Sequence, residues 1–268
     1  IEIIIPEGTI LNASYPAATT LGNHLCPPNA DAIIRALAPV LPGRVTAGWN
    51  NLLCSLSTGH DPIKDDTYVD IFFMGLKGGS GATTECDGYD HIGMIDASGG
   101  VLDQDYEMFE QMTPHLLVRH ELLTDSAGPG RHRGGLGVQT CYRVGSENTQ
   151  LVVFGDGDVE PAFGLFGGGE GTLNKIELHF PDGEVRIPRS KDLLTGVPAG
   201  TVYVQEAGGG GGYGSPLERD ADLVQREVED EKISVGAARS AYGVVLDPET
   251  LALDRVATDA LRASRGGS

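Results

Sequence analysis

Hydrophobic residues recur along this chain at two spacings, one typical of helices and one typical of strands. The segment that begins at Asp31 has apolar residues at helical spacing, namely Ile33, Ile34, Leu37 and Val40. Asp31 is a candidate N-cap for this helix, and Pro42-Gly43 is a stop signal. The pattern therefore predicts one amphipathic helix near the start of the chain.

Apolar runs bounded by turn residues predict strands through most of the remaining sequence. These runs are 1–5, 67–76, 116–123, 138–144, 150–154, 175–180 and 201–207. Asp182-Gly183 follows one of them and favours a tight hairpin. The stretch DSAGPGRHRGGLG, residues 125–137, joins two of them, so we expect a hairpin-like connection with glycine bulges.

The last fifth of the chain changes to helical patterning. Asp220 and Ser234 are candidate N-caps for two helices, and Gly243 can end the second. A third helix is expected at 254–263. The sequence therefore predicts an α+β protein, with a strand-rich body and glycine-rich turns over 1–215 and a helical C-terminal extension over 216–268 packed on that body.

Composition adds a high glycine content and a strong negative charge to this picture. The 268 residues include 39 glycines, roughly double the usual share of about 7%, in short clusters that suggest tight turns and close backbone approaches. The formal net charge of −19 argues against a nucleic-acid partner and against an anionic membrane surface.

Cysteine usage and the chain start bear on the cellular compartment. The four cysteines, Cys26, Cys54, Cys86 and Cys141, are widely spaced without a CxxC pair. Buried thiols of a cytoplasmic protein are the simplest expectation, and a disulfide or reactive thiol stays open. No signal-peptide pattern and no run long enough to span a bilayer occur. Because the first residue is Ile1, we expect a split, cleaved or truncated piece of a longer protein.

Common catalytic and nucleotide-binding motifs are missing from the sequence. No GxxxxGK[ST] string occurs, GPGRHRGG lacks the third glycine of a dinucleotide fingerprint, and neither glycine run opens directly into a predicted helix. GGSGA, residues 78–82, misses the GxSxG spacing, and no zincin pair occurs. Nucleotide binding by this chain alone is thus disfavoured, whereas a Ser-His-Asp triad stays open.

The densest polar cluster is TTECDGYDHIGMID, in which acidic residues surround one histidine. Asp87, Asp90, His91 and Asp96 lie close together in this loop. A carboxylate beside an imidazole suits general acid–base catalysis or metal binding, but a solvated acidic loop is the alternative. Asn23-His24 has the same two interpretations.

Arg131 and Arg133 are two positions apart in the glycine-rich stretch. If the segment is extended, both side chains face one side and could hold a carboxylate or phosphate bidentately. The alternative is that they pair with neighbouring carboxylates such as Asp125.

Five motifs in series carry a family resemblance that no single one would carry. PEGTILNASYPAATTLGNH, DSAGPGRHRGGLG, FGLFGGGEG, EAGGGGGYGSPLERD and SVGAARSAYGVVL occur in that order. This order resembles the C-terminal half of the hydantoinase B/oxoprolinase family, and the resemblance covers essentially the whole chain.

The resemblance implies a subunit of an ATP-dependent enzyme. A hydantoinase A-like partner binds ATP and Mg and phosphorylates an enolate or amide oxygen of a small carbonyl substrate. Some members open cyclic amides such as N-methylhydantoin, 5-oxoproline or lactams. Others, the acetone and acetophenone carboxylases, carboxylate a ketone with bicarbonate. The segment DYEMFEQMTPHLL resembles the ketone carboxylases, so carboxylation is slightly favoured.

The resemblance also implies that this chain completes a site shared with other chains. Family B subunits are about twice this length, and their divalent metal (Mn, Zn or Fe) lies in an N-terminal half that has no counterpart here. No metal ligand is therefore assigned in this chain. A structural subunit that orders that half without supplying a catalytic group is the competing hypothesis.

Candidate site residues follow from these patterns together. His24, Asp90 and His91 are the candidates for proton transfer. Asn23, Arg131 and Arg133 are the candidates for holding the substrate or an anionic intermediate, because positive charge preorganised in a dry site is worth a few kcal/mol.

Overall fold

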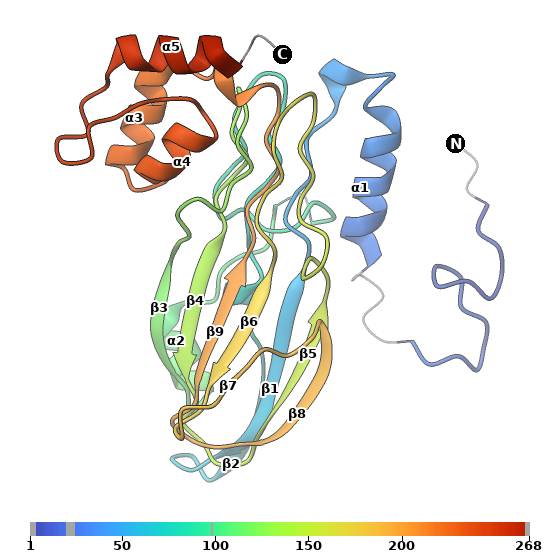
Figure 1. Ribbon diagram of the computed structural model, residues 1–268. Helices are drawn as coiled ribbons and strands as arrows, with labels where there is room; N and C mark the ends of the chain where they lie inside the picture. The colour runs from blue at the N-terminus through green and yellow to red at the C-terminus, as the bar shows by residue number, and fades with distance from the viewer. Residues whose placement is uncertain (1–3, 20–24, 98, 266–268) are drawn as a thin grey trace.

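The computed structural model of this protein describes residues 4–19, 25–97 and 99–265, and most of its strands form two antiparallel sheets (Figure 1). The first sheet has the order β2-β1-β5-β8, with bounds β1 Leu53–Asp61, β2 Asp66–Ile71, β5 Thr149–Gly155 and β8 Lys191–Val197. The second has the order β3-β4-β9-β6-β7, with bounds β3 Leu116–Leu122, β4 Val138–Arg143, β6 Lys175–His179, β7 Val185–Arg186 and β9 Val202–Ala207. The expected strand-rich α+β class is confirmed.

The main hydrophobic core is built from residues of both sheets. Leu53 and Val153 of the first sheet belong to the same buried cluster as Tyr142 and Tyr203 of the second. The rings of Tyr142 and Tyr203 stack with centroids 4.6 Å apart, and Phe72 packs against both. Strands of both sheets alternate buried residues with more accessible ones, as expected where one face of a sheet covers a core.

Glycine-rich extended segments lie side by side beyond one end of the sheets (Figure 1). They include parts of 78–82, 126–137, 162–172 and 207–214, and they bond laterally through their backbones without forming long strands. The Gly79 amide donates to the Gly208 carbonyl at 3.1 Å, and the Gly210 amide donates to the Gly135 carbonyl at 2.9 Å. We call this region the glycine bundle.

Close approach explains why the glycine bundle requires glycine. A Cβ atom on Gly210 would lie 1.9 Å from the Ser80 carbonyl oxygen, and one on Gly134 would lie 1.9 Å from the Gly210 carbonyl oxygen. A side chain at either position would force the neighbouring backbone away and break its hydrogen bonds. The glycine excess of the sequence therefore serves mainly packing between segments, as well as turns.

The segment 125–137 enters the glycine bundle instead of forming a tight hairpin. β3 and β4 do pair antiparallel, with Leu122 opposite Val138 at the end of the register. Between them the chain leaves the sheet and bonds to segments 78–82 and 207–214. The predicted hairpin around Asp182-Gly183 is confirmed, because His179 pairs with Val185.

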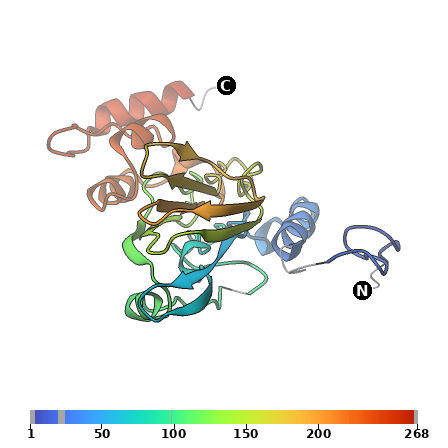
Figure 2. The same cartoon turned by 90° about the horizontal axis from the view of Figure 1, so that it is seen from below.

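The C-terminal helices have a hydrophobic cluster of their own. They are α3 (Ala221–Glu229), α4 (Val235–Ser240) and α5 (Arg255–Arg265), and the cluster includes Val224, Ile233 and Tyr242. Asp220 and Ser234 cap α3 and α4 as the sequence predicts. These helices and α1 (Cys26–Leu37) flank the rest of the molecule on opposite sides (Figure 2). The domain boundary at residue 215 stays a prediction.

Several predicted elements need correction. α1 begins at Cys26 instead of Asp31, since prolines are tolerated in a first helical turn, and this places Asp31 inside the helix and buries it. Ile4 and Ile5 of the predicted first strand are exposed and outside any strand. The predicted strand 67–76 ends at Ile71, and η3 (Phe73–Gly75) follows.

The sequence pattern did not predict the strands β1 and β8 or the helix α2 (Tyr106–Met112). Two further 3₁₀ turns complete the described elements, η2 (Pro42–Arg44) and η4 (Pro216–Glu218).

Candidate functional site

The structure places four of the six candidate residues and leaves two aside. Asn23 and His24 lie outside the described residues, so their roles stay predictions. Asp90 and His91 are neighbours in one loop, yet they contact two different groups of side chains. Arg131 and Arg133 differ as well, because Arg131 is exposed and Arg133 is buried.

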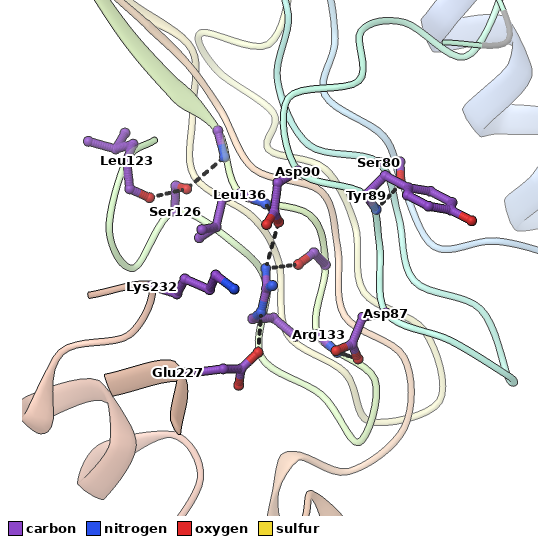
Figure 3. A network of polar contacts seen from close by, with 12 residues as sticks. Ser80, Asp87, Tyr89, Asp90, Leu123, Ser126, Arg133, Leu136, Glu227 and Lys232 are labelled. Atoms are coloured by element: carbon purple, nitrogen blue, oxygen red, sulfur yellow. Dashed lines mark hydrogen bonds and ion pairs between the residues drawn. The ribbon is translucent and has the colours of Figure 1, made fainter. Parts of the chain in front are cut away.

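Asp90 and Arg133 belong to an ion-pair network between the glycine bundle and α3 (Figure 3). The Arg133 side chain donates to Asp90 at 3.1 Å, to Glu227 at 2.9 Å and to the Gly134 carbonyl at 2.6 Å. Burial alone lowers the pKa of Arg133, but the carboxylates of Asp90 and Glu227 outweigh burial and raise it. The guanidinium thus stays charged and has carboxylate partners within the chain.

Arg219 extends this network with two bidentate pairs. It is 1% exposed, and its guanidinium donates twice to Glu227, at 3.0 and 2.8 Å. It also donates twice to Asp87, at 2.8 and 2.6 Å. We call Asp87, Asp90, Arg133, Arg219 and Glu227 the ionic clamp, since it ties loop 87–90 and the glycine bundle to α3.

The two candidate arginines therefore do not share one environment, contrary to the expectation from extended spacing. Arg131 is exposed, and its backbone carbonyl accepts a hydrogen bond from Arg219 at 3.0 Å. Its neighbour His132 forms an isolated bridge with Tyr213. The sequence suggested Asp125 as a partner, but the Asp125 carboxylate accepts from the backbone of Ser234.

His91 lies at a second polar cluster, on the other side of the same loop. Its Nε2 is 3.4 Å from an oxygen of Asp103, within ion-pair distance but without the geometry of a good hydrogen bond. The same oxygen of Asp103 lies 3.1 Å from Nζ of Lys77, whose side chain is 8% exposed. His91 also has a left-handed backbone, with φ of 47°.

His120 of β3 and Tyr106 of α2 complete this cluster. The imidazoles of His91 and His120 lie edge to face with ring centroids 4.9 Å apart. The Tyr106 hydroxyl is 2.9 Å from Nδ1 of His120. Residues of this cluster line a cavity of about 350 Å³, together with Glu121, Leu122 and Val138. We call this the histidine cavity.

Both histidines of the cavity are held in the neutral form. Burial lowers the pKa of His91, and the carboxylate of Asp103 only partly opposes this. Burial, followed by the proximity of His91, lowers the pKa of His120. A neutral imidazole has one donor and one acceptor nitrogen, so the pair can accept and donate protons near pH 7.

The sequence indicated one residue of this cavity and missed three. His91 was found because acidic residues surround it, but Asp103, Tyr106 and His120 lie outside that loop. His120 occupies a half-buried position of a strand, where a histidine carries no sequence signal of its own. The contact between the rings of His120 and His91 forms only when β3 and the loop that contains His91 come together in the folded chain.

A buried serine–histidine pair elsewhere lacks the tautomer that a serine nucleophile needs. Ser57 Oγ is 3.3 Å from Nε2 of His115, and the Gly145 amide donates to Nδ1 at 3.4 Å. Because Nδ1 accepts, Nε2 carries the proton and faces Ser57. Burial lowers the pKa of His115 to about 4, so this form persists at neutral pH. The sequence left a Ser-His-Asp triad open, but His115 cannot act as the base for Ser57 in this arrangement.

The described residues contain no group of three or more His, Cys, Asp or Glu side chains placed to hold a metal ion. The cysteines are free, and the expectation of four buried thiols is wrong for Cys26 and Cys86, which are exposed. Within the described ranges, no helix combines the length and apolar character that crossing a bilayer requires.

Comparison with known proteins assigns this chain to a family. The hydantoinase B/oxoprolinase family profile matches residues 1–216. The chain therefore belongs to the hydantoinase B/oxoprolinase family, and the resemblance inferred from the five motifs is confirmed.

Individual relatives are longer than this chain. It is 35% identical to the caprolactamase subunit beta of Pseudomonas jessenii, over 97% of this chain and 45% of that protein. A crystal structure of that ATP-dependent caprolactamase superposes with a TM-score of 0.84 over 97% of this chain and 46% of the other. The acetone carboxylase alpha subunit of Xanthobacter autotrophicus is 25% identical over 91% of this chain and 36% of that protein. The chain thus spans less than half the length of these relatives.

Proposed function

We propose that this chain is the B-type component of an ATP-dependent enzyme that opens a cyclic amide. Similarity to the caprolactamase subunit beta supports this most strongly, because 35% identity extends over 97% of the chain and the caprolactamase structure superposes over the same share of the chain. The reaction class differs from the carboxylation that the segment DYEMFEQMTPHLL favoured, and the higher identity to caprolactamase is the reason.

The proposed enzyme needs further components. A hydantoinase A-like subunit supplies the ATP and Mg site, and an N-terminal hydantoinase B-like half supplies a divalent metal, Mn, Zn or Fe. This division is supported by the length of the relatives, of which this chain covers 45% and 36%. No step proposed for the residues of this chain passes through a metal.

Within this chain, the histidine cavity is the proposed place of proton transfer. Two neutral imidazoles, a carboxylate and a phenol meet there within contact distance. Arg133 and Asp90 are instead engaged by the ionic clamp, which supports a role in holding the glycine bundle in place. Arg131 remains a candidate for binding an anionic intermediate, because its side chain is exposed.

Carboxylation of a ketone with bicarbonate is the second candidate. It is supported by the segment 105–117, which resembles the ketone carboxylases and places Tyr106 at the histidine cavity. A purely structural subunit is the third candidate, and the extent of the ionic clamp supports it.

Purification of the native complex tests the assignment. Mass spectrometry of co-purifying chains is expected to find an A-like subunit and a further B-like segment. Caprolactam, 5-oxoproline and acetone are then offered with ATP, with and without bicarbonate. Hydrolysis of a cyclic amide that needs ATP but not bicarbonate supports the proposal, whereas bicarbonate-dependent consumption of acetone supports the second candidate. Activity of the isolated chain without partners would overturn both.

A further inference from the structure

The outer face of the first sheet carries a row of apolar side chains that crosses all four strands. Leu56 of β1 lies opposite Ile71 of β2 on one side and opposite Val152 of β5 on the other. Val152 in turn lies opposite Leu193 of β8. The next residue along β5 in the other direction, Leu151, belongs to the buried core, so the row lies on the face that points away from the core. We call Ile71, Leu56, Val152 and Leu193 the apolar row.

Much of the apolar row is open to solvent in this chain. Leu193 is 59% exposed and Val152 is 36% exposed, whereas Leu56 is half-buried. Val69, on the same face of β2, is 63% exposed. An antiparallel sheet with one solvated face normally shows polar side chains there, so apolar residues on both faces are typical of a sheet that is covered on both sides.

A small hydrophobic cluster already covers one end of this face. Cys54 of β1 and Met94 are buried members of that cluster, and Ile71 of the apolar row packs against it. From Ile71 the row leads away to Leu193 on β8, which is an edge strand of the sheet. The exposed part of the row therefore continues an apolar surface that is buried at its other end.

The outer face of the first sheet has no carboxylate, although the chain contains 38 Asp and Glu residues. Side chains alternate between the two faces along each strand, so the positions in register with the apolar row point outward. These positions are Cys54, Leu56, Thr58, His60, Thr67, Val69, Ile71, Gln150, Val152, Phe154, Lys191 and Leu193. Depletion of charged residues distinguishes the centre of a protein interface from ordinary surface.

The outer face of the second sheet provides a comparison within the same molecule. Arg119, Glu177 and Glu206 line a shallow groove on that face, and Glu177 forms ion pairs with Lys175 and His179. Ionic side chains of both signs are ordinary for a sheet face in contact with water. The apolar row is therefore a property of the first sheet and not of the two-sheet architecture as such.

Charge and length select the occupant of this face. Two copies of the chain would each bring a formal net charge of −19, and this repulsion disfavours a dimer of the chain alone. Apolar surfaces that continue a hydrophobic core are typical of obligate interfaces, which resemble a core cut in half. The chain spans 45% of the caprolactamase subunit beta, so more than half of the length of that relative has no counterpart in these 268 residues.

We propose that the apolar row is the docking surface for the part of the B-type component that lies outside these 268 residues, and that this part covers the row with an apolar face of its own. The identity of that component rests on the proposed function. A second copy of the chain and an A-like subunit are the other occupants that an experiment must distinguish.

Photo-crosslinking in the assembled complex identifies the occupant. Benzoylphenylalanine in place of Leu193 should form a product with a peptide of the B-type component from outside these 268 residues, whether that part is joined to this chain or is a separate chain. Val185 is the matched control, because it is 51% exposed on β7 of the second sheet, and the same substitution there should not give that product. A product with an A-like subunit or with a second copy, or no product at all, would overturn the inference.

A charge placed in the apolar row tests whether the complex buries it. Leu193→Lys should lower the midpoint of thermal unfolding of the complex by at least about 2 °C, because the ammonium group would lose its water at the interface. Val185→Lys should change that midpoint by less than about 1 °C, as expected for an exposed surface position. Equal midpoints for the two variants would contradict burial of the row.

Neither measurement depends on catalysis, so this inference and the proposed function can fail separately. If the complex opens no cyclic amide but the expected product forms at Leu193, the proposed reaction fails and the docking surface stands. If the complex opens a cyclic amide but Leu193 reacts with an A-like subunit or a second copy, the docking surface fails and the proposed reaction stands.

Discussion

The imidazoles of His91 and His120 lie edge to face, with ring centroids 4.9 Å apart, although the two residues are 29 positions apart in the sequence. One comes from a loop beside the glycine bundle and the other from β3. Burial lowers the pKa of both imidazoles. Each ring therefore stays neutral at a pH at which an ordinary histidine begins to take up a proton. This pair defines the proposed site more directly than any sequence motif.

Removing the His91 imidazole should abolish proton transfer without unfolding the chain. His91→Asn is the suitable substitution, because asparagine tolerates the left-handed backbone found there. The kcat for cyclic amide hydrolysis should fall at least about 100-fold, as expected when a general base is lost. Thermal unfolding should change little. A rate near that of the wild-type complex would remove His91 from the mechanism.

The acid limb of the pH–rate profile should reflect the lowered pKa of His91. A base must be unprotonated, so activity should persist below the ordinary histidine pKa of 6.5 and fall only under more acid conditions. Asp103→Asn removes the group that opposes this lowering and should move the limb to still lower pH. An acid limb above pH 6.5 would contradict the assignment of His91.

Breaking the ionic clamp should mainly lower the free energy of unfolding, and any effect on catalysis should follow from that loss of stability. Arg219→Ala leaves the carboxylates of Glu227 and Asp87 without their bidentate partner, and loss of one member of a buried ion pair costs about 3–5 kcal/mol. Arg133→Ala should act in the same direction. The exposed Arg226 of α3 supplies the control, since Arg226→Ala should change the free energy of unfolding by less than about 0.5 kcal/mol.

Urea unfolding of these variants distinguishes the clamp from an anion-binding role for Arg133. A stable Arg133→Ala protein that retains partner ATPase but forms no product would favour the anion-binding role.

Adding one methyl group to the glycine bundle should be far more damaging than adding it elsewhere. Gly210→Ala places a Cβ 1.9 Å from a carbonyl oxygen, so the backbone must shift and the loss should exceed about 4 kcal/mol. Gly43→Ala is the matched control, because nothing lies within 4 Å of its Cβ. Soluble yield and thermal unfolding of the two variants provide the comparison, and equal stability would refute the packing role of glycine.

The buried carboxyl of Asp31 should make stability fall as pH rises. Burial raises its pKa from 3.8 to about 7, so the folded state holds a proton that the unfolded state releases. The stabilisation is therefore present below pH 3.8 and is lost as pH rises to about 7, by on the order of 4 kcal/mol.

Asp31→Asn should remove this loss, whereas the exposed Glu107→Gln should not. Urea unfolding at pH 5 and pH 8 measures the difference. If the two variants show the same pH dependence, Asp31 is not the titrating group.

The sequence predicts those elements of the fold that have a local pattern of apolar or capping residues. Strands such as β4 and β9 show local apolar patterns, and the caps Asp220 and Ser234 signal their helices directly. β1 was missed because its inward positions include Ser55 and Ser57, which look polar in sequence but are buried in the fold.

The residues of the candidate site also differ in whether the local sequence indicates them. His91 has a local signal in its acidic loop, but its neighbours Asp103 and His120 come from the segment before α2 and from β3. Arg133 looked like an anion-binding residue because its carboxylate partner Glu227 lies 94 positions away in sequence. Contacts made by chain pairing and by packing of separate segments leave no trace in a single sequence.

The most direct test of the central claim is whether the purified native complex opens caprolactam when ATP is present and bicarbonate is absent. The account predicts ATP-dependent formation of the ring-opened amino acid, with loss of that activity in His91→Asn. Ring opening that proceeds without ATP, or product that forms only from a ketone and bicarbonate, would contradict it.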